Sequence, residues 1–160
     1  MSDAVHTCLW FEDRAEEAAK FYTSLLPDSR IDAMHRPAPD APPVLIHFTI
    51  MGVPYTILQA GPGERHSSAV SIAVVLDSQK KADALYDRIL EAGGSEVQCG
   101  WLTDAWGVSW QIIPEGMQDV LMGGTAEENQ RANVAMRAMK RIDLAELQRA
   151  ARDTTVSAHE

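Results

Sequence analysis

The sequence places a polar residue, Gln111, in the middle of a largely apolar segment, and this position requires an explanation. Gln111 lies in Val108–Ile113, a run rich in the β-branched and aromatic residues that favour strands. Pro114 ends the run, because proline has no N–H to give to a ladder. The amide could hydrogen-bond to a neighbour on the open face of a sheet, or it could point into a ligand cavity. Both interpretations place a polar group on one face of this strand.

The cysteines are the other candidates for chemistry. Neither Cys8 nor Cys99 has a neighbouring base visible in the sequence, so we predict buried structural thiols rather than nucleophiles. Two cysteines do not indicate a disulfide framework, which favours reduced thiols and a cytoplasmic protein. Met1–Phe11 shows no basic segment followed by an apolar run, so no signal peptide is expected.

The charge balance restricts the partners. A net charge of −9 over 160 residues disfavours nucleic acid and anionic membrane surfaces, both of which need a basic patch. No apolar run approaches the length that spans a bilayer. The hydrophobic fraction of 46% and the charged fraction of 23% are typical of a soluble globular domain.

Hydrophobic periodicity predicts the elements that must position Gln111. Asp104 and Gly107 occupy the first and fourth positions of a predicted type I turn, so the two flanking segments form a hairpin. The other predicted elements are a strand over Val5–Phe11, a helix over Ala15–Leu26, strands over Ser29–Met34, Val44–Met51, Val53–Leu58 and Ser71–Asp77, and a helix over Gln79–Leu90.

These elements repeat. A shift of 64 positions places Asp13 on Asp77 and Tyr22 on Tyr86 (77 − 13 = 64), with the apolar helix positions in register. A shift of 55 matches the closing hairpins and places Gly52 on Gly107. The common order of strand, Asp, helix, strand, glycine and strand predicts an internal duplication.

A helical extension follows the repeat. Thr125–Glu128 is a capping-box pattern that predicts a helix to about Met139, and Asp143–Glu146 opens a second helix to about Ala151. The apolar stripe of the first helix could pack on its own domain or on a second subunit. Arg152–Glu160 is expected to be frayed.

A βαβββ unit used twice resembles the vicinal oxygen chelate superfamily, which includes glyoxalase I, extradiol dioxygenases, fosfomycin-resistance proteins and bleomycin-binding proteins. The chain is similar to the PhnB-like branch, whose members often carry the label 3-demethylubiquinone 3-methyltransferase. The segments that carry this resemblance are Leu9–Phe11, Ala15–Tyr22, Ala69–Ile72, Cys99–Asp104, Gly107–Pro114 and Ala138–Asp143.

The resemblance implies an α+β fold in which paired βαβββ modules form two curved mixed sheets around a cleft. The vicinal oxygen chelate domain would cover residues 1–115, with modules over about 5–60 and 69–114, and residues 116–160 would form the helical extension and tail. We expect a homodimer.

The resemblance also implies a location for the site. In metal-dependent members, four inward side chains hold a divalent ion, and those positions fall here on His6, Thr56, Ser71 and Gln111. The shift of 64 that aligns the two helices pairs Thr7, rather than His6, with Ser71. The first of the four positions is therefore uncertain by one residue, between His6 and Thr7. Trp10 and Trp110 are candidate walls of the same ligand cleft.

The donors at these positions do not favour a metal. His6 is the one strong ligand among them, because hydroxyl and amide oxygens bring no negative charge to offset the dehydration of an ion. We therefore predict no tightly bound metal and no cofactor. Among the other histidines, His35 and His66 are predicted in surface loops, whereas His47 lies on a strand and could face the cleft.

Three functions remain open. A mostly apolar cavity with a few donors and acceptors suits a small organic molecule, so a small-molecule-binding protein of unknown substrate is our first prediction. A metal-dependent glyoxalase- or dioxygenase-like enzyme is the second. The third is a quinone-pathway methyltransferase, but the one glycine-rich candidate loop, Gln59–Glu64, leads into a polar linker and a strand rather than a helix.

Overall fold

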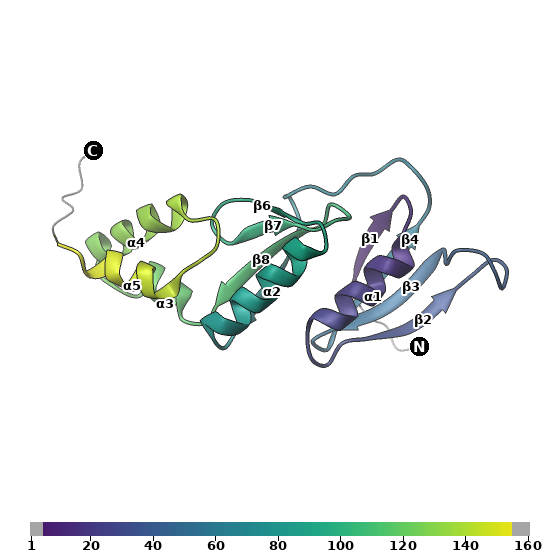
Figure 1. The fold of residues 1–160 in the computed structure, drawn as a ribbon, viewed down its shortest axis with the longest axis horizontal. Coiled ribbons are helices and arrows are strands. Elements are labelled where there is room, and N and C mark those ends of the chain that lie inside the picture. Colours follow the sequence, from purple (N-terminus) through teal and green to yellow (C-terminus); the bar gives the residue numbers. More distant parts are fainter. Residues whose placement is uncertain (1–4, 155–160) are drawn as a thin grey trace. The chain divides into compact units, whose positions relative to one another are not determined.

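The computed structural model describes residues 5–154, and the chain divides into two compact units, residues 1–66 and 67–160. The first unit is built from β1 (Thr7–Phe11), α1 (Ala15–Leu25), β2 (Arg30–His35), β3 (Leu45–Ile50) and β4 (Val53–Gln59). Its sheet, called sheet A below, has the order β1-β4-β3-β2, with β1 parallel to β4 and the other pairs antiparallel (Figure 1).

The second unit repeats this plan. It contains β5 (Ser71–Leu76), α2 (Gln79–Glu91), β6 (Ser95–Glu96), β7 (Trp101–Thr103) and β8 (Ser109–Pro114). Its sheet, called sheet B, has the order β5-β8-β7-β6, again with one parallel pair, β5 with β8. The α+β class and the two βαβββ modules are therefore confirmed, although the sequence predicted no residue range for the two-residue β6.

Each helix covers one face of its own sheet. In the first unit, Tyr22 of α1 and Phe48 of β3 are both fully buried, and their rings lie 6.1 Å apart. In the second unit, α2 packs against β8, and Tyr86 and Ile89 of α2 are buried together with Trp110 of β8. Because successive strand residues point to opposite faces, the alternate positions form a second face that the unit's own helix does not cover. We call this second face the open face.

The closing hairpins use two different turns. Met51 and Gly52 join β3 to β4 with φ of 47° and 78°, as a two-residue turn with two left-handed positions requires. The β7–β8 connection runs through Asp104 and Gly107, and the Gly107 N–H donates to the Asp104 carbonyl at 3.1 Å. Gly107 has a φ of 89°, so the predicted turn is confirmed.

The C-terminal helices pack within the second unit. They are α3 (Met117–Met122), α4 (Ala126–Ala138) and α5 (Leu144–Arg152). The capping box of Thr125 and Glu128 is formed, and the Asp143 side chain accepts from the Glu146 N–H, as predicted. Leu121, Ala132 and Ala151 form the core of this helical layer, so the stripe of α4 packs on its own chain.

The segment between α4 and α5 ties this layer to sheet B and α2. The N–H groups of Cys99 and Gly100 donate to the carbonyls of Met139 and Lys140 at 2.8 and 2.7 Å. Gln79 of α2 donates to the Ile142 carbonyl at 2.7 Å and accepts from the Leu144 N–H at 3.0 Å. The tail predicted to fray lies, from residue 155 on, outside the described residues. Among residues 5–154, no helix has the length and apolar character needed to cross a bilayer.

Candidate functional site

Polar side chains occupy the middle of the open face of sheet A. Thr56 of β4 pairs with Cys8 of β1 on one side and with His47 of β3 on the other, so all three lie in one row across the sheet. The Nδ1 atom of His47 lies 3.0 Å from the Thr56 Oγ1 atom, within hydrogen-bond distance. This contact fixes the imidazole against the strand that carries the predicted site residue Thr56.

Two further imidazoles flank His47. Its ring centroid lies 6.4 Å from that of His6 and 5.4 Å from that of His35, with interplanar angles of 76° and 85°. Both contacts are the edge-to-face arrangement that aromatic rings favour. His6 and His35 are exposed and His47 is half-buried. We call His6, His35 and His47 the histidine row.

The open face of sheet B carries a neutral pair. Gln111 of β8 donates through Nε2 to the Ser71 Oγ atom at 2.8 Å. Ala73 of β5 and Trp101 of β7 are the register partners of Gln111. The structure therefore places Gln111 on the open face with a hydrogen bond to a neighbour, which is the first of the two interpretations of its sequence. That neighbour, Ser71, is itself a predicted site residue.

The strand registers decide which residue of the first strand corresponds to Ser71. Cys8 pairs with Thr56 and Ala73 pairs with Gln111, so the repeat offset is 55 for the last strands (111 − 56) and 65 for the first strands (73 − 8). The offset of 65 carries His6, not Thr7, onto Ser71 (71 − 6 = 65).

The helices nevertheless repeat with an offset of 64, because the first β–α connection holds one more residue than the second. Three residues separate Phe11 from Ala15, whereas two separate Leu76 from Gln79. Arg14, just before α1, takes up a left-handed conformation with a φ of 54°. The sequence left the residue that corresponds to Ser71 ambiguous because the repeat was aligned on the helices. Their offset of 64 differs from the offset of 65 between the first strands.

The two tryptophans predicted as cleft walls lie on different faces. Trp10 is half-buried and shares the face of Cys8, two residues before it, while its indole N–H donates to the Gly61 carbonyl at 3.0 Å. Trp110 is fully buried and donates to the Asp104 Oδ2 atom at 2.9 Å. As the strand neighbour of Gln111, Trp110 must face α2, so it does not line the open face.

The structure also corrects the prediction for the cysteines and one histidine. Cys8 is exposed rather than buried, and Cys99 is half-buried with a φ of 59° in the turn before β7. His35 ends β2 instead of lying in a loop. The sequence missed the contact between His35 and His47 because the predicted strand stopped at Met34, one residue too early.

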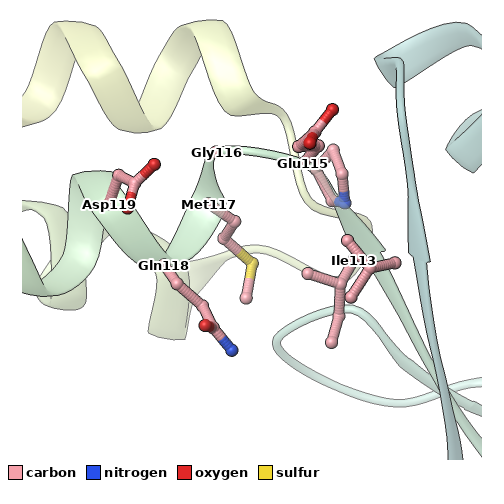
Figure 2. A pocket seen from close by; sticks show the side chains of 8 residues that line it. Ile113, Glu115, Gly116, Met117, Gln118 and Asp119 are labelled. Carbon is pink, nitrogen blue, oxygen red and sulfur yellow. The ribbon is translucent and has the colours of Figure 1, made fainter.

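A small pocket lies at the end of sheet B's open face. Its volume is about 180 Å³, and Val75 and Ile113, which pair across β5 and β8, form part of its wall. Figure 2 shows Met117 extending from the start of α3 towards Ile113. Glu115 and Asp119 contribute carboxylates at the exposed rim. The pocket continues the surface on which Gln111 lies.

The donors at the four positions that the resemblance marks do not suit a catalytic divalent cation. His6, Thr56, Ser71 and Gln111 supply one imidazole, two hydroxyls and one amide, without a carboxylate or thiolate. Within the part of the chain that the structure describes, no group of three or more His, Cys, Asp or Glu side chains is arranged to hold a metal ion.

Comparison with known proteins identifies the family. The model of the family described as 3-demethylubiquinone-9 3-methyltransferase matches residues 3–113, more than half of the chain. The chain belongs to this family. Its PhnB-like fold is that of the vicinal oxygen chelate superfamily. The search of curated proteins gave no match.

Solved structures agree with this assignment. A PhnB protein from Bacillus cereus is 26% identical, with a TM-score of 0.64 over 70% of this chain and 99% of that one. The protein PA1353 from Pseudomonas aeruginosa is 22% identical, with a TM-score of 0.60 over 71% and 98% of the two chains. The fosfomycin resistance protein FosX from Listeria monocytogenes, solved with Mn(II) and sulfate, is 17% identical, with a TM-score of 0.51 over 69% and 89%. The last two likenesses concern the fold.

Proposed function

We propose that this PhnB-like protein binds a small organic molecule on an open face of a sheet, without a resident metal ion. Small-molecule sites are mostly apolar surfaces with a few well-placed polar groups that orient the ligand. The open faces fit this description: the histidine row and Thr56 lie on sheet A, and Ser71 and Gln111 lie beside Ala73 and Val75 on sheet B.

The observation that carries the proposal is the hydrogen bond from Gln111 to Ser71. A primary amide has two N–H groups and one carbonyl oxygen, and the bond to Ser71 Oγ uses one N–H. The bond holds the amide in one orientation on the open face. A ligand that meets an already oriented donor and acceptor loses less entropy on binding than one that must order them.

The alternatives have less support. The Listeria FosX structure contains Mn(II), whereas His6, Thr56, Ser71 and Gln111 of this chain supply mostly neutral oxygen donors. For a methyltransferase, the glycine-rich loop at Gly61–Gly63 should lead from a parallel strand into a helix, but it leads to β5. The homodimer remains a prediction, which sedimentation equilibrium of the purified protein would test.

The first test combines a ligand screen with one substitution. A thermal-shift screen against metabolites identifies ligands, and calorimetry then compares the wild type with Gln111→Leu. We expect binding to weaken by about tenfold, the equivalent of about 1.4 kcal/mol. The melting temperature of the free variant should hardly change, because leucine suits a strand.

The matched control is Gln130→Leu, the same substitution on the exposed side of α4. It should bind the ligand as the wild type does. A Gln111→Leu protein that loses much of its stability, or that binds every ligand normally, would contradict the proposal. Stoichiometric retention of Ni²⁺, Zn²⁺, Fe²⁺ or Mn²⁺ after dialysis would contradict its metal-free part.

A further inference from the structure

We propose that the histidine row on sheet A is an oxyanion site, which holds a carboxylate or phosphoryl group. This inference rests on the proposed function and names the chemical class of one end of the ligand. It adds His35 and His47, which are not among the four positions that the family resemblance marks.

Three side chains that can carry a positive charge lie close together on this face. His6 and His35 each contact the ring of His47 edge to face, and the two outer rings are exposed. A protonated imidazole donates from both ring nitrogens. The Nδ1 atom of His47 is held by Thr56, so Nε2 is the ring nitrogen of His47 that remains for a ligand. Hydrogen bonds from charged donors to an oxyanion are roughly twice as strong as neutral ones.

The other charged groups on this face do not oppose an anion. Asp32 of β2 carries a carboxylate whose two oxygens contact the Arg30 guanidinium at 2.8 Å and the Thr49 hydroxyl at 2.7 Å. The Cys8 thiol lies in the same row as Thr56 and His47. The three imidazoles are therefore the groups beside Thr56 that can carry a positive charge, although the whole chain carries a net charge of −9.

The second unit shows that this chemistry is particular to the first. By the strand registers, Ser71 corresponds to His6 and Gln111 to Thr56. The neighbour of Gln111 on β7 is Trp101, which takes the place that His47 has beside Thr56. Sheet B thus offers neutral donors and an aromatic ring where sheet A offers imidazoles, so we assign the oxyanion site to sheet A.

Binding at this row should depend on pH. Histidine is the side chain whose charge changes between about pH 5 and 8. An oxyanion bound by imidazolium groups favours their protonated forms, so anion affinity should fall as the pH rises. We expect at least about a tenfold loss of affinity between about pH 6 and about pH 8.

The experiment uses the full chain and two simple probes, inorganic phosphate and acetate, followed by NMR of the histidine side chains. At about pH 6, saturable shifts should appear together at His6, His35 and His47, and should largely disappear at about pH 8. Stronger binding of phosphate than of acetate would indicate a phosphoryl ligand, and the reverse a carboxylate. Either result supports an oxyanion site.

Two variants separate the site from a general effect of charge. His47→Asn keeps a polar group beside Thr56 and should abolish the saturable shifts at His6 and His35. His66→Asn changes a histidine of the same unit that contacts the Phe11 ring instead of the row, and should bind the probes as the wild type does. The melting temperature of each variant verifies that it is folded.

The inference is overturned if the shifts do not saturate, if His66 responds like the row, or if binding is unchanged at high pH. Ligands from the metabolite screen that are uncharged and do not compete with phosphate would overturn it while the proposed function stands. Saturable phosphate binding with no organic ligand found would support the oxyanion site and count against the proposed function.

Discussion

The first and second units share a strand order, but different interactions stabilise their closing hairpins. In the first unit, the turn at Met51 and Gly52 depends on two backbone positions with positive φ. In the second, the buried Asp104 side chain accepts from the N–H groups of Trp106 and Val108 through Oδ1 and from the Trp110 indole through Oδ2. The N–H groups of Met51 and Gly52 also donate to the Ser29 Oγ atom and the Asp28 carbonyl, each at 3.0 Å. Backbone conformation and bonds to the residues just before β2 therefore hold the first turn, whereas a buried carboxylate holds the second.

The comparison indicates which positions keep their residue type in both copies of the duplicated unit. The buried positions correspond closely, as Ile57 with Ile112 and Leu9 with Val74 show. The open faces diverge, with His6 replaced by Ser71 and Thr56 by Gln111. Burial under the helix constrains the residue type, because losing apolar contacts there costs several kcal/mol, whereas an uncovered face is free to change its chemistry.

The largest expected effect concerns the carboxylate. Asp104→Ala removes the acceptor for three buried or half-buried N–H groups, including that of the fully buried Trp110. We expect the free energy of unfolding of the second unit to fall by about 4 kcal/mol, since hydrogen bonds to a charged group are the strong ones and the donors lose their partner. Urea unfolding followed by tryptophan fluorescence measures it.

The control for this change lies in the first unit. Asp40→Ala makes the same substitution at an exposed loop position and should change the unfolding free energy by less than about 0.5 kcal/mol. If Asp104→Ala were equally mild, the hairpin of the second unit would be held by its backbone alone, and the contrast between the two turns would disappear.

A smaller effect is expected from a pair of glycines with the same backbone conformation. Gly61 and Gly100 have φ of 81° and 80°. A Cβ on Gly100 would lie 2.8 Å from the Ile142 Cγ1 atom and 3.0 Å from the Ile112 carbonyl oxygen, whereas one on Gly61 would meet nothing within 4 Å. Gly100→Ala should therefore cost about 3 kcal/mol and Gly61→Ala about 1 kcal/mol.

Thermal and urea unfolding of both variants make this comparison. The backbone strain is common to the two positions, so the difference measures the contacts of the turn before β7 with the Ile112 carbonyl of β8 and with Ile142 in the segment that follows α4. Equal losses would show that this segment yields easily, and that the C-terminal helices are less firmly tied to the second unit than the hydrogen bonds of Cys99 and Gly100 suggest.

Local signals in the sequence predicted most of the fold. The Asp104–Gly107 turn, the capping box at Thr125 and the repeated strand–helix pattern each depend on a few adjacent residues, and each is confirmed. The two-residue β6 and the six-residue α3 were missed, because elements this short carry too few residues to show a period.

The candidate site was harder to predict because it depends on strand pairing. The contact of His35 with His47 needs the β2–β3 register, which includes a bulge between Ile31 and Ala33 that the sequence does not reveal. The placement of Trp110 was within reach, however. Once Gln111 is assigned to the open face, strand alternation alone sends Trp110 to the opposite one.

The smallest expected effect is on pH dependence and involves Tyr86, which the helix repeat aligns with Tyr22. Burial and the nearby Glu96 carboxylate, which accepts the Tyr86 O–H at 3.3 Å, together raise the pKa of Tyr86 from 10.0 to about 12, against the opposing Arg141 guanidinium. The folded state therefore holds this proton more tightly than the unfolded state. Its contribution to stability is complete below about pH 10 and decreases as the pH rises towards about 12.

Replacing the tyrosine isolates this contribution from the lysines that titrate in the same range. The unfolding free energy of the wild type should fall more steeply between about pH 10 and 12 than that of Tyr86→Phe. Ultraviolet titration of the phenolates should show one fewer late-ionising group in the variant. Parallel stability curves would mean that Tyr86 ionises as readily in the folded protein as in the unfolded chain. In that case, the cover that Arg141 provides over its ring, 4.5 Å from the centroid, would not exclude solvent.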